Sequence, residues 1–254
     1  RKAIRFLDDC NIKTLIAKSE KPALDNPASA FSVPDIEFDL LLGQVPFELS
    51  PGQRETVDKI REGFAENRAL DCIISGDVGS GKSAVQFLAV GICHVAGKLS
   101  ALMAPNELLA KQLFNNFSAM FPSVPSVYLG GGSTLTEDDI ENKSVIIGTT
   151  AIVHSVKKYN ISFDLICLDE QQKIGIGQKT TLLSSHTNLL ESTATCIPRS
   201  QAHVLFGAKQ IFRLGSHNTK TINSYICDSA HRQNVFEHLK NVLADGHKAA
   251  VIYP

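Results

Sequence analysis

The sequence has almost no net charge, no long apolar run and no closely spaced pair of cysteines. The 25 Lys and Arg residues nearly balance the 26 Asp and Glu residues, so no overall electrostatic field draws the chain to nucleic acid or to a membrane surface. No run of about 18 apolar residues is present, which excludes a transmembrane helix. The 254 residues are enough for one or two domains with a sizeable core.

The six cysteines are scattered, without a C-x-x-C pair or the spacing of metal ligands. Cys72 and Cys167 fall inside apolar runs and are expected to be small buried residues. This usage favours a reducing compartment, and residues 1–21 lack the apolar core of a signal peptide. We therefore expect an intracellular, cytoplasmic protein. Since the chain starts at Arg1 and stops directly after an apolar run, we also expect a fragment of a longer protein.

The order of apolar and polar stretches predicts an α/β fold. Residues 1–21 have helical spacing, whereas residues 22–49 are acidic and proline-rich and indicate a connector with a short helix near 40–42. Ser50 and Pro51 then open a helix. Further along, predicted strands at 72–74, 99–104, 145–147, 164–168, 189–193, 222–227 and 249–253 alternate with predicted helices at 82–95, 106–119, 136–141 and 229–244. Such alternation is typical of a central, mostly parallel sheet flanked by helices.

The strongest motif is Gly76-Asp77-Val78-Gly79-Ser80-Gly81-Lys82-Ser83, which matches G-x-x-x-x-G-K-[ST] in full. A predicted strand enters it and a predicted helix leaves it, so backbone N–H groups and the helix N-terminus can surround a phosphate. Lys82 is expected to reach the β- and γ-phosphates of ATP, and the Ser83 hydroxyl to ligate Mg²⁺. The motif therefore predicts a P-loop domain with ATP and Mg²⁺ as ligands.

A second motif is the apolar strand that ends in Asp169 and Glu170, as a Walker B element does. Asp169 would hold Mg²⁺, and Glu170 would activate the attacking water as general base. The carboxyl ends of parallel strands bring both motifs to one edge of the sheet. A third segment, 191–195, is either a sensor of the γ-phosphate or an ordinary polar turn.

Taken in this order, GDVGSGKS, LDEQQ and STATCIPRS resemble the RecG-type branch of superfamily-two DNA helicases. The likeness includes PFELSPGQ at 46–53, MAPNELLAKQ at 103–112, GTTAI at 148–152 and DEQQKIGIGQK at 169–179. It implies a RecA-like first motor lobe at 46–215, preceded at 1–45 by a helix and acidic connector from a wedge domain. At 216–254 it implies a linker and the start of a second lobe.

The resemblance also implies an activity and a set of site residues. The activity is ATP-dependent remodelling of branched DNA, such as forks and Holliday junctions, in recombination and repair, with the second lobe of the same polypeptide as a partner. Gln53 would read adenine, with Phe47 packed nearby. The residues implied to couple hydrolysis to movement are Gln172, Thr193, Ala194 and Thr195. Those implied to face DNA are Pro105, Asn106, Thr149 and Arg199.

The chain departs from the family pattern at several positions. Gln172 stands where His is usual, Ile174 where Phe is usual, Cys196 replaces Pro, and Ser83 replaces Thr conservatively. The second lobe, whose arginine finger is worth about 10³–10⁵ in rate, only begins here. We therefore expect this chain alone to bind ATP but to hydrolyse it poorly.

Two other functions stay open at this point. One is a nucleotide-gated DNA-binding module without efficient turnover, and the other is a duplex DNA translocase of the transcription-coupled repair type. Residues 192–227 hold no Asp or Glu but include four Lys and Arg. This basic block is either a phosphate-contacting face or a solvated connector.

Overall fold

The computed structural model describes residues 30–170, 181–194, 209–215, 226–228, 231–249 and 251. The chain divides into two compact units, Arg1–Asn218 and Thr219–Pro254. The second unit contributes helix α10, Arg232–Ala244, where the sequence predicted a helix. The predicted helix within 1–21 lies outside the described residues, as do most residues of the predicted strands at 222–227 and 249–253.

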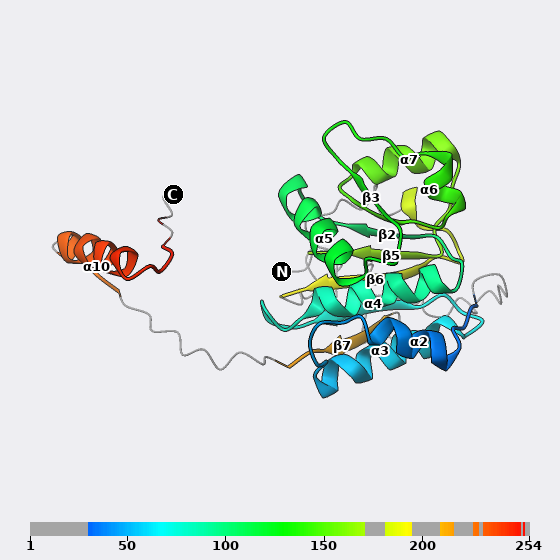
Figure 1. Cartoon of the computed structure of the whole chain (residues 1–254), viewed down its shortest axis with the longest axis horizontal. Coiled ribbons are helices and arrows are strands. Elements are labelled where there is room, and N and C mark those ends of the chain that lie inside the picture. The colour runs from blue at the N-terminus through cyan, green and yellow to red at the C-terminus, as the bar shows by residue number, and fades with distance from the viewer. Residues whose placement is uncertain are drawn as a thin grey trace, which may run out of the picture. The chain divides into compact units, whose positions relative to one another are not determined.

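Seven strands form one sheet in the first unit, in the order β3-β4-β2-β5-β6-β1-β7, and every neighbouring pair is parallel. Figure 1 shows this sheet with β3 near one end and β7 at the other. The strands are β1 Asp71–Ser75, β2 Ser100–Met103, β3 Ser126–Leu129, β4 Val145–Gly148, β5 Leu165–Leu168, β6 Asn188–Thr193 and β7 Gln210–Arg213. The α/β class with a parallel sheet is thus confirmed.

Helices pack on the sheet and bury both of its faces. Along β2, Leu102 joins a cluster with α4 and α5, whereas Ala101 and Met103 join a second cluster with α7. Strands buried on both faces read as continuous apolar runs, which is why they were predicted without a period of two. The helices of this unit are α2 Asp35–Leu42, α3 Pro51–Phe64, α4 Lys82–Val95, α5 Glu107–Met120, α6 Glu137–Glu141 and α7 Ala151–Tyr159.

Residues 30–45, which the sequence assigned to a connector, contribute to the core. Phe31 stacks on Phe64 of α3 with ring centroids 4.7 Å apart. Phe38 and Leu41 of α2 are buried, and Leu41 packs over Gly91 of α4, where a Cβ would lie 3.1 Å from it. The predicted boundary at residue 45 therefore runs through packed structure. Among the described acids of this segment, Asp35, Glu37 and Asp39 of α2 are exposed to solvent while the opposite side of the helix is packed.

Three elements escaped the sequence analysis: β3, α7 and β7. The strands β3 and β7 lie at the two edges of the sheet and have four residues each. An edge strand contacts one neighbour and leaves half-exposed positions, so it carries no continuous apolar run.

The cysteines that were expected to be buried are buried. Cys72 and Cys167, together with Cys93, are free thiols in the core. Burial raises the pKa of all three thiols, so they are poor nucleophiles. Among the described residues, no helix combines the length and the apolar character that crossing a bilayer requires.

A pair of variants tests whether α2 belongs to the core. Phe38→Ala is expected to lower the free energy of unfolding by about 3–5 kcal/mol, because it opens a cavity. Leu40→Ala on the same helix, at a side chain that is 67% exposed, is expected to change it by less than about 0.5 kcal/mol. Urea unfolding followed by circular dichroism measures both. Equal effects would mean that α2 is only loosely attached.

Candidate nucleotide-binding site

The loop Gly76–Gly81 joins β1 to α4 and depends on three glycines. Gly79 and Gly81 have φ angles of +86° and +81°, which side chains disfavour. Gly76 is crowded, since a Cβ there would lie 2.5 Å from Ser80 Oγ and 3.0 Å from the carbonyl oxygen of Leu214. Gly81 is the N-cap of α4 and supplies no side-chain cap, so the helix start can receive an anion instead.

Lys82 begins α4, and its ammonium group lies inside the curve of the loop. Its Nζ donates to the carbonyl oxygens of Gly76, at 2.7 Å, and Asp77, at 2.9 Å. Burial lowers the pKa of Lys82, although Glu170, Asp169 and Asp77 act to raise it. The cation is partly stripped of water and faces nearby carboxylates, so it is placed to exchange backbone carbonyls for phosphate oxygens.

Asp169 and Glu170 follow β5 at the carboxyl edge of the sheet, as predicted. The Asp169 N–H donates to the Met103 carbonyl at 2.9 Å, which ties the residue to β2. Glu170 has a φ of +52°, an uncommon conformation for a residue with a side chain. Such outliers concentrate at functional sites, where the surrounding structure maintains them.

Two side chains near Asp169 make contacts that the sequence did not predict, although Ser192 belongs to the segment 191–195 that was considered as a γ-phosphate sensor. Ser192 Oγ on β6 donates to Asp169 Oδ1 at 2.6 Å, because the register pairs Leu168 with Glu191 and so brings the next residues together. Gln86 on α4 is fully buried, and its Nε2 donates to the Leu168 carbonyl at 3.4 Å. The only sequence signal that could have indicated a role for Gln86 was its amide side chain within an otherwise apolar stretch of the helix.

Gln53 links α3 to the phosphate-binding loop. Its Oε1 accepts from the Ser50 N–H at 2.9 Å, completing a capping box, and its Nε2 donates to the Ser80 carbonyl at 2.9 Å. A pocket of about 460 Å³ lies beside this link. It is lined by Phe47, Glu48, Leu49, Ser50, Pro51, Gln53 and Gly79. The structure thus brings Phe47 and Gln53 together at the loop.

The residues expected to couple hydrolysis to movement are only partly described. Thr193 ends β6, pairs with Ser75, and its carbonyl accepts from the Gly76 N–H at 3.3 Å. Ala194 follows it directly. Gln172 and Thr195 lie outside the described residues, so the coupling role stays a prediction.

The residues expected to face DNA follow two adjacent strands, β2 and β4. Pro105 and Asn106 come after β2, and the Asn106 side chain accepts from the Leu109 N–H at 2.9 Å as the N-cap of α5. Thr149 comes after β4 and is half-buried. Arg199 lies outside the described residues. Pro105, Asn106 and Thr149 share the carboxyl edge with the P-loop but lie on the other side of β5 in the strand order.

The residues predicted to hold Mg²⁺ provide oxygen ligands. Mg²⁺ is held in such sites by one or two protein oxygens, substrate phosphates and several waters. The Ser83 hydroxyl and the Asp169 carboxylate fit this set. Within the described residues, no group of three or more His, Cys, Asp or Glu side chains could hold a metal ion by itself.

The parallel sheet with its loop at the β1–α4 junction defines a P-loop nucleotide-binding domain of the RecA-like type. A family model described as DEAD/DEAH box helicase matches residues 50–210, more than half of the chain. The chain therefore belongs to the DEAD/DEAH box helicase family.

Individual relatives and solved structures agree with this assignment. The chain is 31% identical to "ATP-dependent DNA helicase RecG" of Borreliella burgdorferi over 236 residues, which cover 87% of this chain and 34% of the relative. It is 34% identical to the protein of that name in Streptococcus pneumoniae over 172 residues, 64% of this chain and 26% of the relative. The chain thus spans about a third of the curated relatives it matches.

Two solved structures share the fold. A structure of RecG bound to a three-way DNA junction superposes with a TM-score of 0.74 and 21% identity, covering 97% of this chain and 35% of that one. The UvsW helicase from bacteriophage T4 gives a TM-score of 0.54 with 18% identity, covering 74% of this chain and 71% of that one.

Titration of Lys82 tests its distance from the carboxylates. We expect Glu170→Gln to lower the pKa of Lys82 further, because Glu170 acts to raise it. Nitrogen NMR of the Lys82 ammonium between about pH 8 and 11 would measure this change. Glu137→Gln, at an exposed site on α6, is the control. If the pKa of Lys82 is unchanged or higher in Glu170→Gln, the Glu170 carboxylate is too far from the Lys82 ammonium to interact with it.

Proposed function

We propose that this chain is the first motor lobe of an ATP-dependent DNA helicase of the RecG type, which couples ATP hydrolysis to the remodelling of branched DNA. The observation that carries the proposal is the P-loop before α4 at the same sheet edge as Asp169 and Glu170 after β5, in a chain aligned over 87% of its length with a RecG relative. The junction-bound RecG structure supports branched DNA as the substrate.

In this proposal the β- and γ-phosphates of ATP bind between the loop amides and Lys82. Ser83 and Asp169 would hold Mg²⁺, which would neutralise phosphate charge when bound. The hydrogen bond from Ser192 fixes the orientation of the Asp169 carboxylate. Glu170 takes the proton of the attacking water as general base.

The adenine would occupy the pocket beside Phe47 and Gln53. Each atom of the Gln53 amide already has one partner within the chain. An amide NH₂ carries two hydrogens and its oxygen two lone pairs. Gln53 can therefore read an adenine edge while it keeps its bonds to Ser50 and Ser80, so recognition of the base would also brace the phosphate loop.

DNA would cross the carboxyl edge of the sheet at Pro105, Asn106 and Thr149, with Arg199 contacting phosphates. Gln172, Thr193, Ala194 and Thr195 would relay loss of the γ-phosphate to this track. The second lobe of the same polypeptide would supply the arginine finger, so this lobe alone turns over slowly. We propose an intracellular, cytoplasmic location, which suits the buried free thiols.

Two variants separate binding from turnover. Lys82→Ala is expected to weaken binding of MgATP by at least about tenfold in calorimetry, since a charge-assisted hydrogen bond contributes about 1.5–3 kcal/mol. Glu170→Gln in the two-lobed protein is expected to bind normally but to lose about 10²–10⁴ in turnover. The exposed Lys157→Ala on α7 is the control. Normal MgATP affinity in Lys82→Ala would refute the nucleotide site.

A salt titration tests the DNA track. Arg199→Gln is expected to weaken DNA binding and to reduce the slope of log affinity against log salt by about 1, because one fewer counterion is released. The control is Arg68→Gln, an exposed position that precedes β1 at the opposite edge of the sheet. Equal slopes for Arg199→Gln and the unmodified protein would assign Arg199 a structural role.

A further inference from the structure

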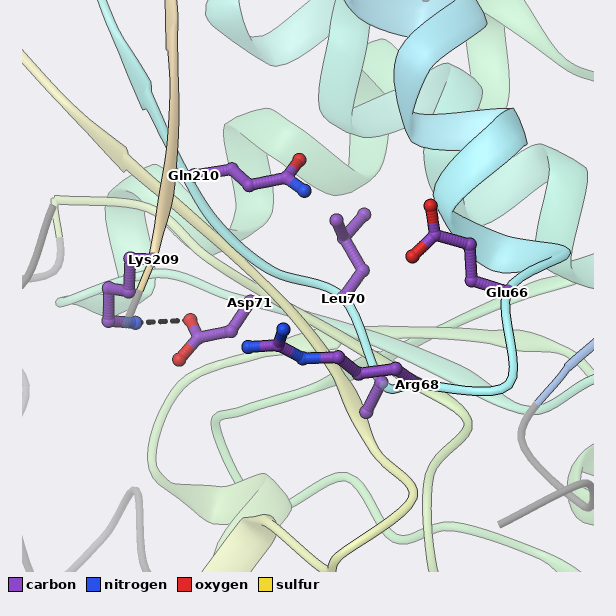
Figure 2. Close-up of a pocket in the computed structure, with 7 residues that line it drawn as sticks. Glu66, Arg68, Leu70, Asp71, Lys209 and Gln210 are labelled. Atoms are coloured by element: carbon purple, nitrogen blue, oxygen red, sulfur yellow. Dashed lines mark hydrogen bonds and ion pairs between the residues drawn. The ribbon is translucent and has the colours of Figure 1, made fainter. Parts of the chain in front are cut away.

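Three charged side chains meet at strands β6, β1 and β7, away from the nucleotide site. Lys209, directly before β7, donates to Glu191 Oε2 at 2.8 Å and to Asp71 Oδ1. Figure 2 shows the Lys209 ammonium pointing at the Asp71 carboxylate, beside a pocket of about 80 Å³. The Lys209 side chain is 13% exposed and that of Glu191 only 3%. We call these three residues the charge clamp.

The charge clamp spans three strands. In the strand order, β1 lies between β6 and β7, so Lys209 reaches past β1 to bind Glu191. Burial acts to lower the pKa of Lys209, but Asp71 and Glu191 outweigh it, and the net shift is upward. The ammonium group is thus held as a cation between two carboxylates. A buried charge of this kind is tolerated only when it is paired, which fixes the position of the residue that carries it.

The clamp adds a polar anchor to β7, whose Phe212 side chain is buried in the core, as is that of Leu214 directly after the strand. Strand β7 has four residues, lies at the sheet edge and pairs with β1 alone. At its other end, the Leu214 N–H donates to the Ser75 carbonyl at 2.8 Å, and Leu214 closes over Gly76 of the phosphate loop. The strand is therefore fixed by charge at its start and by the P-loop at its end.

Strand β7 lies directly before the second unit of the chain, so its anchoring can affect how the two units are coupled. It is the last strand of the first unit, and the second unit begins at Thr219, a few residues beyond Leu214. A movement of the second unit that is transmitted along the chain would therefore reach β7 first. An anchored strand would pass such a movement on to Gly76, whereas a loosely held strand would absorb it.

We propose that Lys209 and Glu191 are positioning residues that make β7 a rigid link between the second lobe and the P-loop. The inference rests on the proposed two-lobed motor. It adds that coupling between DNA-driven lobe movement and the nucleotide depends on the charge clamp, although Asp71 and Lys209 lie at the end of β1 opposite to the P-loop. The three clamp residues therefore affect nucleotide binding and turnover only indirectly, by holding β7 in place.

The test uses the full-length protein with Lys209→Met, Lys209→Arg and a matched control, Lys98→Met. Lys98 is also a partly buried lysine, paired with Asp164 at 3.6 Å, but it has no link to β7. In Lys209→Met we expect amide exchange of Ile211–Leu214 to quicken by at least about tenfold. We expect the ratio of DNA-stimulated to basal ATP hydrolysis to fall by about fivefold or more. Lys209→Arg should recover most of both, and Lys98→Met should change neither.

A second variant guards against simple misfolding. Glu191→Gln keeps the shape of the side chain and leaves Lys209 paired with Asp71, so it should give the same two changes to a smaller degree. If Lys209→Met and Glu191→Gln lower the melting temperature but leave the exchange of β7 and the stimulation ratio unchanged, the link is refuted. If the unmodified protein shows no DNA-stimulated hydrolysis, the proposed function fails, while exchange of β7 still decides whether Lys209 anchors it.

Discussion

The parallel pairing of β5, β6 and β1 is the constraint on which the rest of the site depends. It places the end of the P-loop strand and the end of the Asp169 strand at one edge, with β6 between them. From this ladder follow the influence of Asp169 and Glu170 on Lys82 and the hydrogen bond from Ser192 to Asp169. A helix-based scaffold would need specific packing to achieve what the register of three strands achieves here by backbone hydrogen bonds.

The parts of the molecule that were predictable from sequence are those specified locally. The loop Gly76–Ser83 needs glycines at fixed offsets before a helix, and the chain carries them within eight consecutive residues. Buried strands such as β4 and β5 are continuous apolar runs. By contrast, the pairing of Lys209 with Asp71 joins residues 138 positions apart, and nothing near either residue indicates the other. The Ser192–Asp169 bond escaped prediction for the same reason, since it depends on the register of β5 and β6.

The packing of α2 and the bonds of Gln53 show how the segment before the P-loop is integrated with the nucleotide site. Arg61 of α3 donates to the Val33 carbonyl at 2.6 Å and lies 4.5 Å from the centroid of the Phe38 ring, so α3 and the segment at 30–42 are joined by polar and apolar contacts. At its other end α3 begins with the capping box that includes Gln53. Helix α3 therefore connects the segment at 30–42 to the loop that would bind phosphate. The acidic composition of that segment predicted a connector and gave no sign of this packing.

The central position of β1 has a consequence for how the lobe is made on the ribosome. The P-loop strand is completed at Ser75, yet both of its partners are synthesised more than 100 residues later, β6 ending at Thr193 and β7 at Arg213. At about 5–20 residues per second, β1 remains unpaired at both edges for about 6–24 s before β6 is complete. By contrast, β2 and β4, which lie next to each other in the sheet, can pair with each other much earlier. Because β1 leads directly into the loop Gly76–Gly81, this loop stays without its flanking strands until the sheet is nearly complete.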